Sequence, residues 1–192
     1  MKAAEIADIF RQTGAFLEGH FILSSGLHSP NYMQCAKVLQ YPEHGERFAR
    51  AMVPKLEALK PTVVLAPALG GILVGYELAR ALKVRSIFAE RVDGAMSLRR
   101  GQDLSKSDRV VLCEDVVTTG KSIKEVEALC QAVGAEVVAM AAIVDRSGGK
   151  WALSKPLTSL LTMELVTHDP ANCPLCKSGS PAVKPGSRPM PS

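Results

Sequence analysis

From residue 62 onward, predominantly apolar segments alternate with amphipathic segments, and this alternation limits the possible folds more than any other feature. The amphipathic segments have helical spacing, and one of them ends at Gly134. Apolar strands that alternate with helices are typical of parallel strands covered on both faces. We therefore predict an α/β fold with a doubly wound, mainly parallel sheet. The predicted strands are 62–66, 84–90, 109–115, 135–145 and 159–166.

The segment before residue 62 has a different pattern. Apolar spacing predicts a helix over 3–12, and two apolar arms, 15–23 and 31–39, flank a segment with Gly and Pro that indicates a hairpin. A longer helix is predicted over 42–59, with Pro54 inside it as the residue that should kink or divide it. These elements form a small N-terminal, hairpin-bearing cap.

We accordingly divide the chain into three parts. Residues 1–60 form the cap, which is integral to the fold, and residues 61–176 form the α/β core. Residues 177–192 are rich in Pro, Gly and Ser and are predicted to be a disordered tail.

Composition excludes several classes of function. The chain has 192 residues and a net charge of +4, and three of those positive charges lie in the last sixteen residues. A nearly neutral body with 5% aromatic residues argues against nucleic acid as a partner. The longest uncharged run, 61–76, is too short and too interrupted by Gly and Pro for a membrane span, and the N-terminus lacks a signal peptide. Five scattered cysteines indicate reduced thiols and a cytoplasmic protein.

Ligands of doubly wound sheets bind beyond the carboxyl ends of the strands. Three loops are expected there: 67–71, 116–122 and 145–149. The second follows a strand that ends in two adjacent acids, Glu114 and Asp115, and it leads into a helix. Backbone N–H groups at that helix N-terminus suit a phosphate, and the carboxylates suit vicinal sugar hydroxyls or a hard cation held through water. The segment therefore predicts a ribose 5-phosphate site.

A nucleoside-triphosphate P-loop is the competing interpretation, because Gly120-Lys121-Ser122 matches the end of that motif. The motif requires a glycine five positions before its second glycine. The chain has Asp115 at that position, where a carboxylate would face the phosphates. We therefore reject the P-loop.

The segment VVLCEDVVTTGKS (110–122) resembles the signature of the type I phosphoribosyltransferases, which binds 5-phosphoribosyl 1-diphosphate (PRPP). Within that superfamily the chain is similar to the orotate phosphoribosyltransferases over about residues 10 to 176. Three further segments support the resemblance in the expected order: FILSSGLHSPNYMQ (21–34), APALGGILVGYELA (66–79) and IVDRSGG (143–149).

The resemblance implies a role for each matching residue. The PRPP-binding residues would be Glu114, Asp115, Val116, Val117, Thr118, Thr119, Gly120, Lys121 and Ser122, with Ala68, Leu69, Gly70 and Gly71 at the diphosphate. The orotate-binding residues would be Thr118, Arg146, Tyr32 and Met33, with the arginine at the substrate carboxylate. Catalysis would involve Arg91, Arg99, Arg100 and Asp115. The resemblance also implies Mg²⁺, bound mainly through PRPP and with no certain protein ligand, and a homodimer.

A structural role is also open for several of these residues. Glu114 and Asp115 could cap a strand at the surface, although the flanking apolar strand and TTGKS favour the ligand role. Gly70 and Gly71 could allow close strand–helix packing, and Arg146 could be a surface residue. Tyr32 and Met33 could belong to the core of the cap.

The cationic segment 90–108 departs from the family pattern. In the family this region is a flexible lid that delivers Arg and Lys to the leaving diphosphate, often in the neighbouring subunit. Arg91 matches the first arginine of the pattern, but no Lys or His occupies the later positions, where Arg99 and Arg100 are the available substitutes. Lys106 is the remaining cation of the segment. A second departure is Ser24, at a position where many members have lysine.

Cys173 and Cys176 form a single CxxC motif. A structural zinc site needs four ligands, and His168 and Cys35 are conceivable additions that the spacing does not demand. A reduced local turn is the favoured interpretation, with a zinc site and a redox pair as alternatives.

The expected activity is Mg²⁺-dependent transfer of ribose 5-phosphate from PRPP to N1 of orotate, which gives orotidine 5′-phosphate and diphosphate. The nearest alternative is the same reaction with a purine base as acceptor. A different class is a PRPP-sensing regulator that binds nucleic acid, for which the nearly neutral body offers little support.

Overall fold

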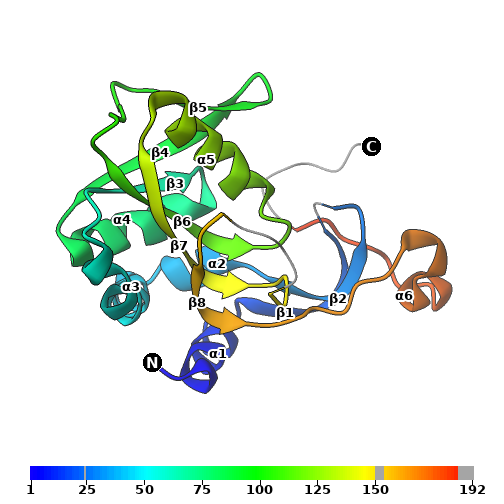
Figure 1. Cartoon of the computed structure of the whole chain (residues 1–192). Helices are drawn as coiled ribbons and strands as arrows, with labels where there is room; N and C mark the ends of the chain where they lie inside the picture. Colours follow the sequence, from blue (N-terminus) through cyan, green and yellow to red (C-terminus); the bar gives the residue numbers. More distant parts are fainter. Residues whose placement is uncertain (24, 150–153, 186–192) are drawn as a thin grey trace.

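The computed structural model describes residues 1–23, 25–149 and 154–185 and contains a six-stranded sheet (Figure 1). The strand order is β5-β4-β3-β6-β7-β8, and β5 alone pairs antiparallel with its neighbour. The bounds are β3 Val63–Pro67, β4 Arg85–Val92, β5 Ala95–Leu98, β6 Arg109–Val117, β7 Glu136–Asp145 and β8 Leu157–Thr162. The five predicted strands and the parallel, doubly wound fold are confirmed.

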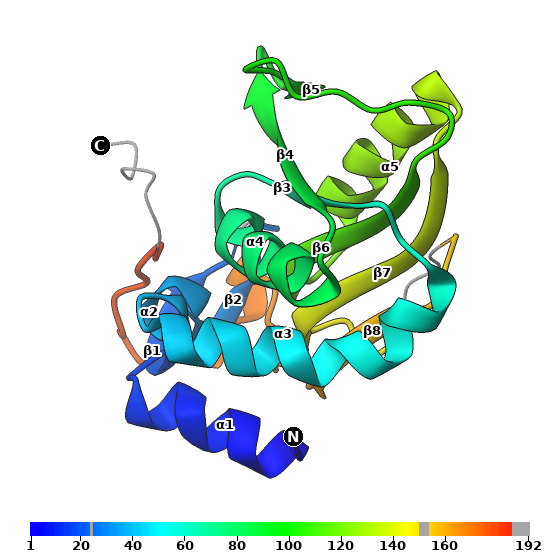
Figure 2. The ribbon, with the colours of Figure 1, turned by 90° about the vertical axis from the view of Figure 1, so that its left-hand side faces the viewer.

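Helices cover both faces of the sheet. Helices α3 (Pro42–Leu56) and α4 (Gly70–Leu82) pack on one face, with α1 (Ala3–Gln12) against β8 (Figure 2). Helix α5 (Lys121–Val133) packs on the opposite face. The core is correspondingly split into two apolar clusters, because the side chains of each strand alternate between the two faces.

Close packing between α4 and β3 depends on a glycine. A Cβ atom built on Gly75 would lie 2.9 Å from Cβ of Ala66, which is shorter than a normal contact between two carbon atoms. The absence of a side chain therefore lets the helix approach the sheet. This approach holds the start of α4 beside the carboxyl end of the strand.

The N-terminal cap is formed by α1 and an antiparallel pair of strands, β1 (Phe16–Ile22) and β2 (His28–Met33). The helix and the hairpin are as predicted. Residues 35–39 of the expected second arm instead form a short helix, α2 (Cys35–Leu39), which buries Val38 and Leu39 in the core. Their apolar character suits either element because both would be buried.

Pro54 lies inside α3 and does not divide it. The helix runs to Leu56 and is followed by a 3-10 turn, η1 (Glu57–Leu59). Because Pro54 comes near the end of the helix, its missing N–H group and its ring disturb the last turn only.

The C-terminal segment has more structure than its composition indicates. After β8 come a 3-10 turn, η2 (Pro170–Asn172), and a short helix, α6 (Pro174–Lys177). Residues 178–185, which fall in the predicted disordered tail, then run beside the hairpin (Figure 1). Val183 donates to the carbonyl of His20 at 2.8 Å and accepts from the N–H of Ile22 at 2.8 Å. Residues 186–192 lie outside the described residues.

Among the described helices, none combines the length and the apolar character that crossing a membrane requires.

Candidate functional site

The carboxyl ends of β3, β6 and β7 lie at one edge of the sheet, because these strands are parallel neighbours. Strand β6 extends to Val117, two residues beyond its predicted end, so Glu114 and Asp115 lie within the strand rather than in the loop. Val117 is buried in the core on the α5 side. Its side chain therefore does not reach the cavities described below.

Asp115 touches the start of α4. A Cβ atom on Gly70 would lie 2.7 Å from both carboxylate oxygens of Asp115, so only glycine leaves room for this carboxylate. Gly71 lies against the backbone of β6, where a Cβ would be 3.0 Å from the carbonyl oxygen of Cys113. The two glycines thus allow close packing, as one reading of the sequence proposes, and they also bring the loop after β3 to the acids.

The two acids are partly desolvated. Burial, followed by the neighbouring charge of Asp115, raises the pKa of Glu114 to about 8, although a hydrogen bond from Ser122 opposes the shift. Burial also raises the pKa of Asp115, against backbone N–H donors that lower it. Carboxyl groups near the carboxyl ends of the strands that pair with no cation among the described residues are suited to accept hydrogen bonds from a bound polyol.

The loop after β6 forms one side of a cavity of about 560 Å³. Gly120 precedes α5 with φ of 68°, a left-handed conformation that glycine adopts without strain. The first backbone N–H groups of α5 are free of partners within the helix and favour an anion. The cavity is lined by Ser25, Arg91, Glu114, Val116, Thr118, Thr119, Gly120, Lys121 and Ser122.

A second cavity of about 570 Å³ adjoins the first and shares Ser25, Val116, Thr118 and Thr119 with it. Its wall contains the sequence candidates Tyr32, Met33, Asp115 and Arg146. The cap and the core therefore meet here, and the candidates from both parts lie around one space.

Arg146 is the unusual residue of this second cavity. Its backbone N–H donates to the carbonyl of Val117 at 2.8 Å, which positions the residue beside the loop after β6. Its Nε is buried and has no hydrogen-bond partner among the described residues. Burial lowers the pKa of Arg146. A desolvated guanidinium with an unused donor is suited to a planar anion such as a carboxylate.

The cations of the hairpin β4–β5 are arranged differently from one another. Arg91 lines the first cavity and forms an ion pair with Glu125 of α5. Arg99 and Arg100 lie after β5, outside the two cavities, and both pair with Glu90, at 4.0 and 3.2 Å.

Lys106 is at the opposite edge of the sheet. Its Cβ is 3.7 Å from the position of a Cβ on Gly134, at the C-terminal end of α5. Because strand ends and helix N-termini face the cavities, a residue at a helix C-terminus is a whole helix length away. Of the four candidate cations, Arg91 is therefore the one that lines the first cavity.

Some cavity residues have no signal in the sequence. Lys184 and Pro185, from the predicted tail, line the second cavity, together with Leu165 and Thr167 from the segment after β8. Lys184 and Pro185 follow Val183, which pairs with β1. Leu165 and Thr167 precede His168, which pairs with His28 of β2, so both contacts join distant parts of the chain. Ser24 lies outside the described residues, whereas Ser25 lines both cavities.

The residues suggested as additional ligands for the CxxC motif lie elsewhere. Cys35 is buried at the start of α2 and lines the second cavity, and His168 pairs with His28 through backbone hydrogen bonds. The side chains beside Cys173 and Cys176 are instead those of His20 and His28.

Comparisons with known proteins agree with this geometry. Residues 37–174 match the family model of the phosphoribosyl transferase domain. The chain is 52% identical to an orotate phosphoribosyltransferase of Caldicellulosiruptor saccharolyticus over 180 residues, which cover 94% of each chain. It is 51% identical to that of Heliobacterium modesticaldum over 191 residues, covering 98% of this chain and 100% of the relative.

Solved structures give the same result. The crystal structure of orotate phosphoribosyltransferase from Aeropyrum pernix superimposes with a TM-score of 0.69 and 25% sequence identity, covering 82% of this chain and 93% of that chain. The family model spans more than half of the chain, and relatives about half identical match it over almost its whole length. The chain therefore belongs to the type I phosphoribosyltransferases and, within them, to the orotate phosphoribosyltransferases of pyrimidine biosynthesis.

Proposed function

We propose that the two adjoining cavities carry out transfer of ribose 5-phosphate from PRPP to N1 of orotate, releasing diphosphate. The observation that carries the proposal is the arrangement around Thr118 and Thr119, which line both cavities. Glu114 and the N-terminus of α5 lie at the first cavity, whereas Asp115 and Arg146, whose buried Nε has no partner among the described residues, lie at the second. This arrangement suits a phosphate, a sugar and a carboxylated base that lie one after another across the two cavities.

In this proposal the loop Thr118–Ser122 binds the 5-phosphate through backbone N–H groups, hydroxyl groups and the positive end of α5. Glu114 and Asp115 accept hydrogen bonds from the ribose hydroxyls and so orient the sugar. The loop 68–71, which Gly70 brings against Asp115, binds the diphosphate. Arg91 contributes positive charge at the wall of the first cavity.

Arg146 binds the carboxylate of orotate through its guanidinium group, with Tyr32 and Met33 beside the ring. These contacts direct N1 of the base toward C1 of the ribose. As the bond from C1 to diphosphate breaks, positive charge develops on the sugar, and the electron pair of that bond leaves with the diphosphate. N1 gives up its proton to an oxygen of the departing diphosphate or to water, and its electron pair forms the new bond at C1. No side-chain nucleophile is needed, so catalysis consists of positioning and charge stabilisation.

The acids and the phosphate cradle also fit a hard divalent cation, because carboxylate and phosphate oxygens are the ligands that Mg²⁺ prefers. When bound, Mg²⁺ supplies neutralisation of the diphosphate charge. We expect the ion to be held mainly by PRPP, with Glu114 and Asp115 contributing through water.

We also propose a homodimer. Leu73 and Tyr76 of α4, and Leu69 immediately before it, are exposed large apolar residues with helical spacing. An apolar stripe of this kind is suited to a protein interface. Light scattering coupled to gel filtration tests this proposal, and a monomeric mass contradicts it.

The free state of all five cysteines supports the expected cytoplasmic location.

The test of the activity is diphosphate release from PRPP and Mg²⁺ with orotate, adenine, xanthine or uracil in separate reactions. Release with orotate alone supports both the reaction and the acceptor. Release with a purine alone would retain the PRPP site and contradict the role of Arg146. Binding of PRPP without release in any reaction favours the regulator that binds nucleic acid, which filter binding to RNA and DNA then tests.

A further inference from the structure

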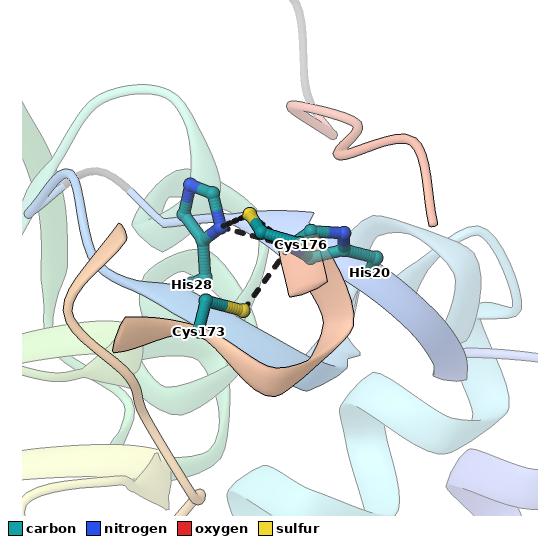
Figure 3. Close-up of side chains that lie close together, drawn as sticks. All are labelled: His20, His28, Cys173 and Cys176. Carbon is teal, nitrogen blue, oxygen red and sulfur yellow. Dashed lines mark hydrogen bonds between the residues drawn. The ribbon is translucent and has the colours of Figure 1, made fainter. Parts of the chain in front are cut away.

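Four potential metal ligands converge beside the hairpin β1–β2, and none of the four lines either cavity. Ile22 pairs with His28 across the hairpin, next to a bulge between Glu18 and Phe21, and Nε2 of His20 lies 2.8 Å from Nδ1 of His28. Cys173 and Cys176 approach these histidines from the turn that begins α6 (Figure 3). One ligand atom from each of the four residues lies within 4.8 Å of the other three.

The separations match those of a tetrahedral zinc site. Zinc binds sulfur at about 2.3 Å and imidazole nitrogen at about 2.0 Å, so a tetrahedron places sulfur and nitrogen ligands roughly 3.6 Å apart. Nε2 of His20 is 3.5 Å from Sγ of Cys173 and 3.7 Å from Sγ of Cys176. Nδ1 of His28 is 3.3 Å from Sγ of Cys176.

The two imidazole nitrogens are closer than in a filled site. Nε2 of His20 and Nδ1 of His28 are 2.8 Å apart, whereas a zinc tetrahedron places two nitrogens roughly 3.3 Å apart. A movement of about half an ångström between the rings therefore suffices to admit the ion. Rotation of either ring about its side-chain bonds provides this movement.

The ring of His20 is also oriented as metal-binding histidines are. Its Nδ1 lies 2.8 Å from the carbonyl oxygen of Ser180, to which it donates. In the neutral ring this places the proton on Nδ1 and leaves the lone pair of Nε2 directed at the cysteines. A backbone carbonyl that holds the second ring nitrogen is a typical outer contact of a metal ligand.

We propose that His20, His28, Cys173 and Cys176 bind a structural Zn²⁺ ion. Two thiolates and two imidazoles in a tetrahedral arrangement favour zinc over hard ions such as Mg²⁺. Three of the ligands are buried, since His20, His28 and Cys173 have exposed fractions of 4%, 8% and 0%, and Cys176 is exposed at the surface. Four protein ligands complete the coordination of the ion, so it holds the structure together and takes no part in the reaction. A disulfide would account for the two cysteines only.

The ion would join the hairpin to the C-terminal segment. Beyond the cysteines that segment returns to β1 at Val183, and the next residues, Lys184 and Pro185, line the second cavity. The hairpin contributes Ile22 and Leu23 to the same cavity. Zinc binding therefore fixes two parts of the cavity wall relative to each other.

The experiment uses the full chain, expressed with zinc in the medium and purified with a phosphine reductant. We expect one zinc ion per chain by inductively coupled plasma mass spectrometry after gel filtration. Cys176→Ser and His20→Asn are expected to lose most of the zinc. His168→Asn is the matched control and should retain it, because His168 contacts this region through its backbone only.

A second measurement avoids dependence on variants that fail to fold. Replacement of zinc by Co²⁺ in the unmodified chain should give the intense visible bands and the thiolate charge-transfer band of a tetrahedral sulfur–nitrogen site. A chain that retains no metal, retains iron in place of zinc, or contains a Cys173–Cys176 disulfide after this purification would falsify the proposal. Diphosphate release is measured separately, so an active enzyme without zinc contradicts this proposal alone, and an inactive enzyme with zinc contradicts the proposed reaction alone.

Discussion

Two groups of polar side chains adjoin the hairpin β1–β2, and they differ in how their atoms are paired. At the edge of the sheet, Arg146 has a buried Nε without a partner among the described residues, and desolvation shifts the pKa of Glu114 and Asp115 upward. In the cluster of His20, His28, Cys173 and Cys176, the ligand atoms face one another within 4.8 Å. The first group faces a large cavity, whereas three of the four residues of the second are buried.

This difference separates binding groups from structural groups. Buried polar atoms in proteins are normally paired, so donors and acceptors left unpaired beside a cavity indicate a ligand that supplies the missing partner. Groups that converge on one point with tetrahedral spacing need only an ion at that point. We therefore expect changes at the sheet edge to affect turnover and changes at the cluster to affect stability.

The largest effect is expected for Asp115→Asn. The amide cannot accept ribose hydrogen bonds as a carboxylate does, and the loss of one preorganised polar contact in an active site typically costs about 10²- to 10³-fold in kcat. Steady-state diphosphate release measures this effect. The melting temperature should change little, since asparagine has nearly the same shape beside Gly70.

Asp8→Asn is the control for Asp115→Asn, because Asp8 pairs with Arg11 on the exposed face of α1. It should leave kcat unchanged. Equal turnover of Asp115→Asn and the unmodified chain would contradict the placement of ribose at the acids.

Removal of zinc should have the next largest effect, and on stability. A ligand present at 100 times its dissociation constant stabilises the folded state by about 2.7 kcal/mol. For a domain of this size that corresponds to a fall in melting temperature of about 5 to 10 °C on chelation. Differential scanning calorimetry with and without a chelator measures it. Cys176→Ser should show no further fall with chelator, whereas His168→Asn should behave as the unmodified chain.

Arg146→Ala should weaken the use of orotate. A hydrogen bond to a charged group contributes about 1.5 to 3 kcal/mol, so we expect kcat/KM for orotate to fall by roughly 10- to 100-fold. Binding of PRPP measured by calorimetry should be nearly unchanged, because Arg146 lies in the second cavity. Arg50→Ala, which removes an exposed ion pair with Glu46, is the control. An equal loss of affinity for PRPP would refute the division of the two cavities between phosphate and base.

A further effect concerns the pH dependence of stability. The pKa of Glu114 is raised from 4.5 to about 8 on folding, so the folded state favours the protonated acid. Its contribution to the free energy of unfolding is therefore fully present below pH 4.5 and is lost as the pH rises to about 8.

Glu114→Gln tests this because glutamine does not titrate. In urea unfolding, the variant should lose less stability than the unmodified chain between pH 4.5 and about 8. Glu136→Gln is a control at the opposite end of the sheet, where Glu136 pairs with Arg109. Parallel pH profiles for Glu114→Gln and the unmodified chain would show that burial does not perturb this acid.

Local sequence patterns were sufficient for the five parallel strands of the sheet and for most of the loop after β6, whereas β5 was not among the predicted strands. The position of Glu114 and Asp115 near the end of β6 and the left-handed Gly120 before α5 depend on residues close together in the chain. Arg146 could be placed for a similar reason, because the carboxyl ends of parallel strands meet at one edge. The roles of Arg99 and Arg100 could not be predicted, since their ion pairs with Glu90 depend on how the β4–β5 hairpin folds back.

The sequence by itself determined the α/β core, the position of its ligand edge and the chemistry expected there, because periodicity and turn residues act over short distances. Only the tertiary structure decided that Lys184 reaches the cavity and that His20 and His28 lie beside Cys173 and Cys176. Those contacts join residues about 150 positions apart. No periodicity records such a pairing, since it is created when the C-terminal segment packs against β1 and exchanges backbone hydrogen bonds with it.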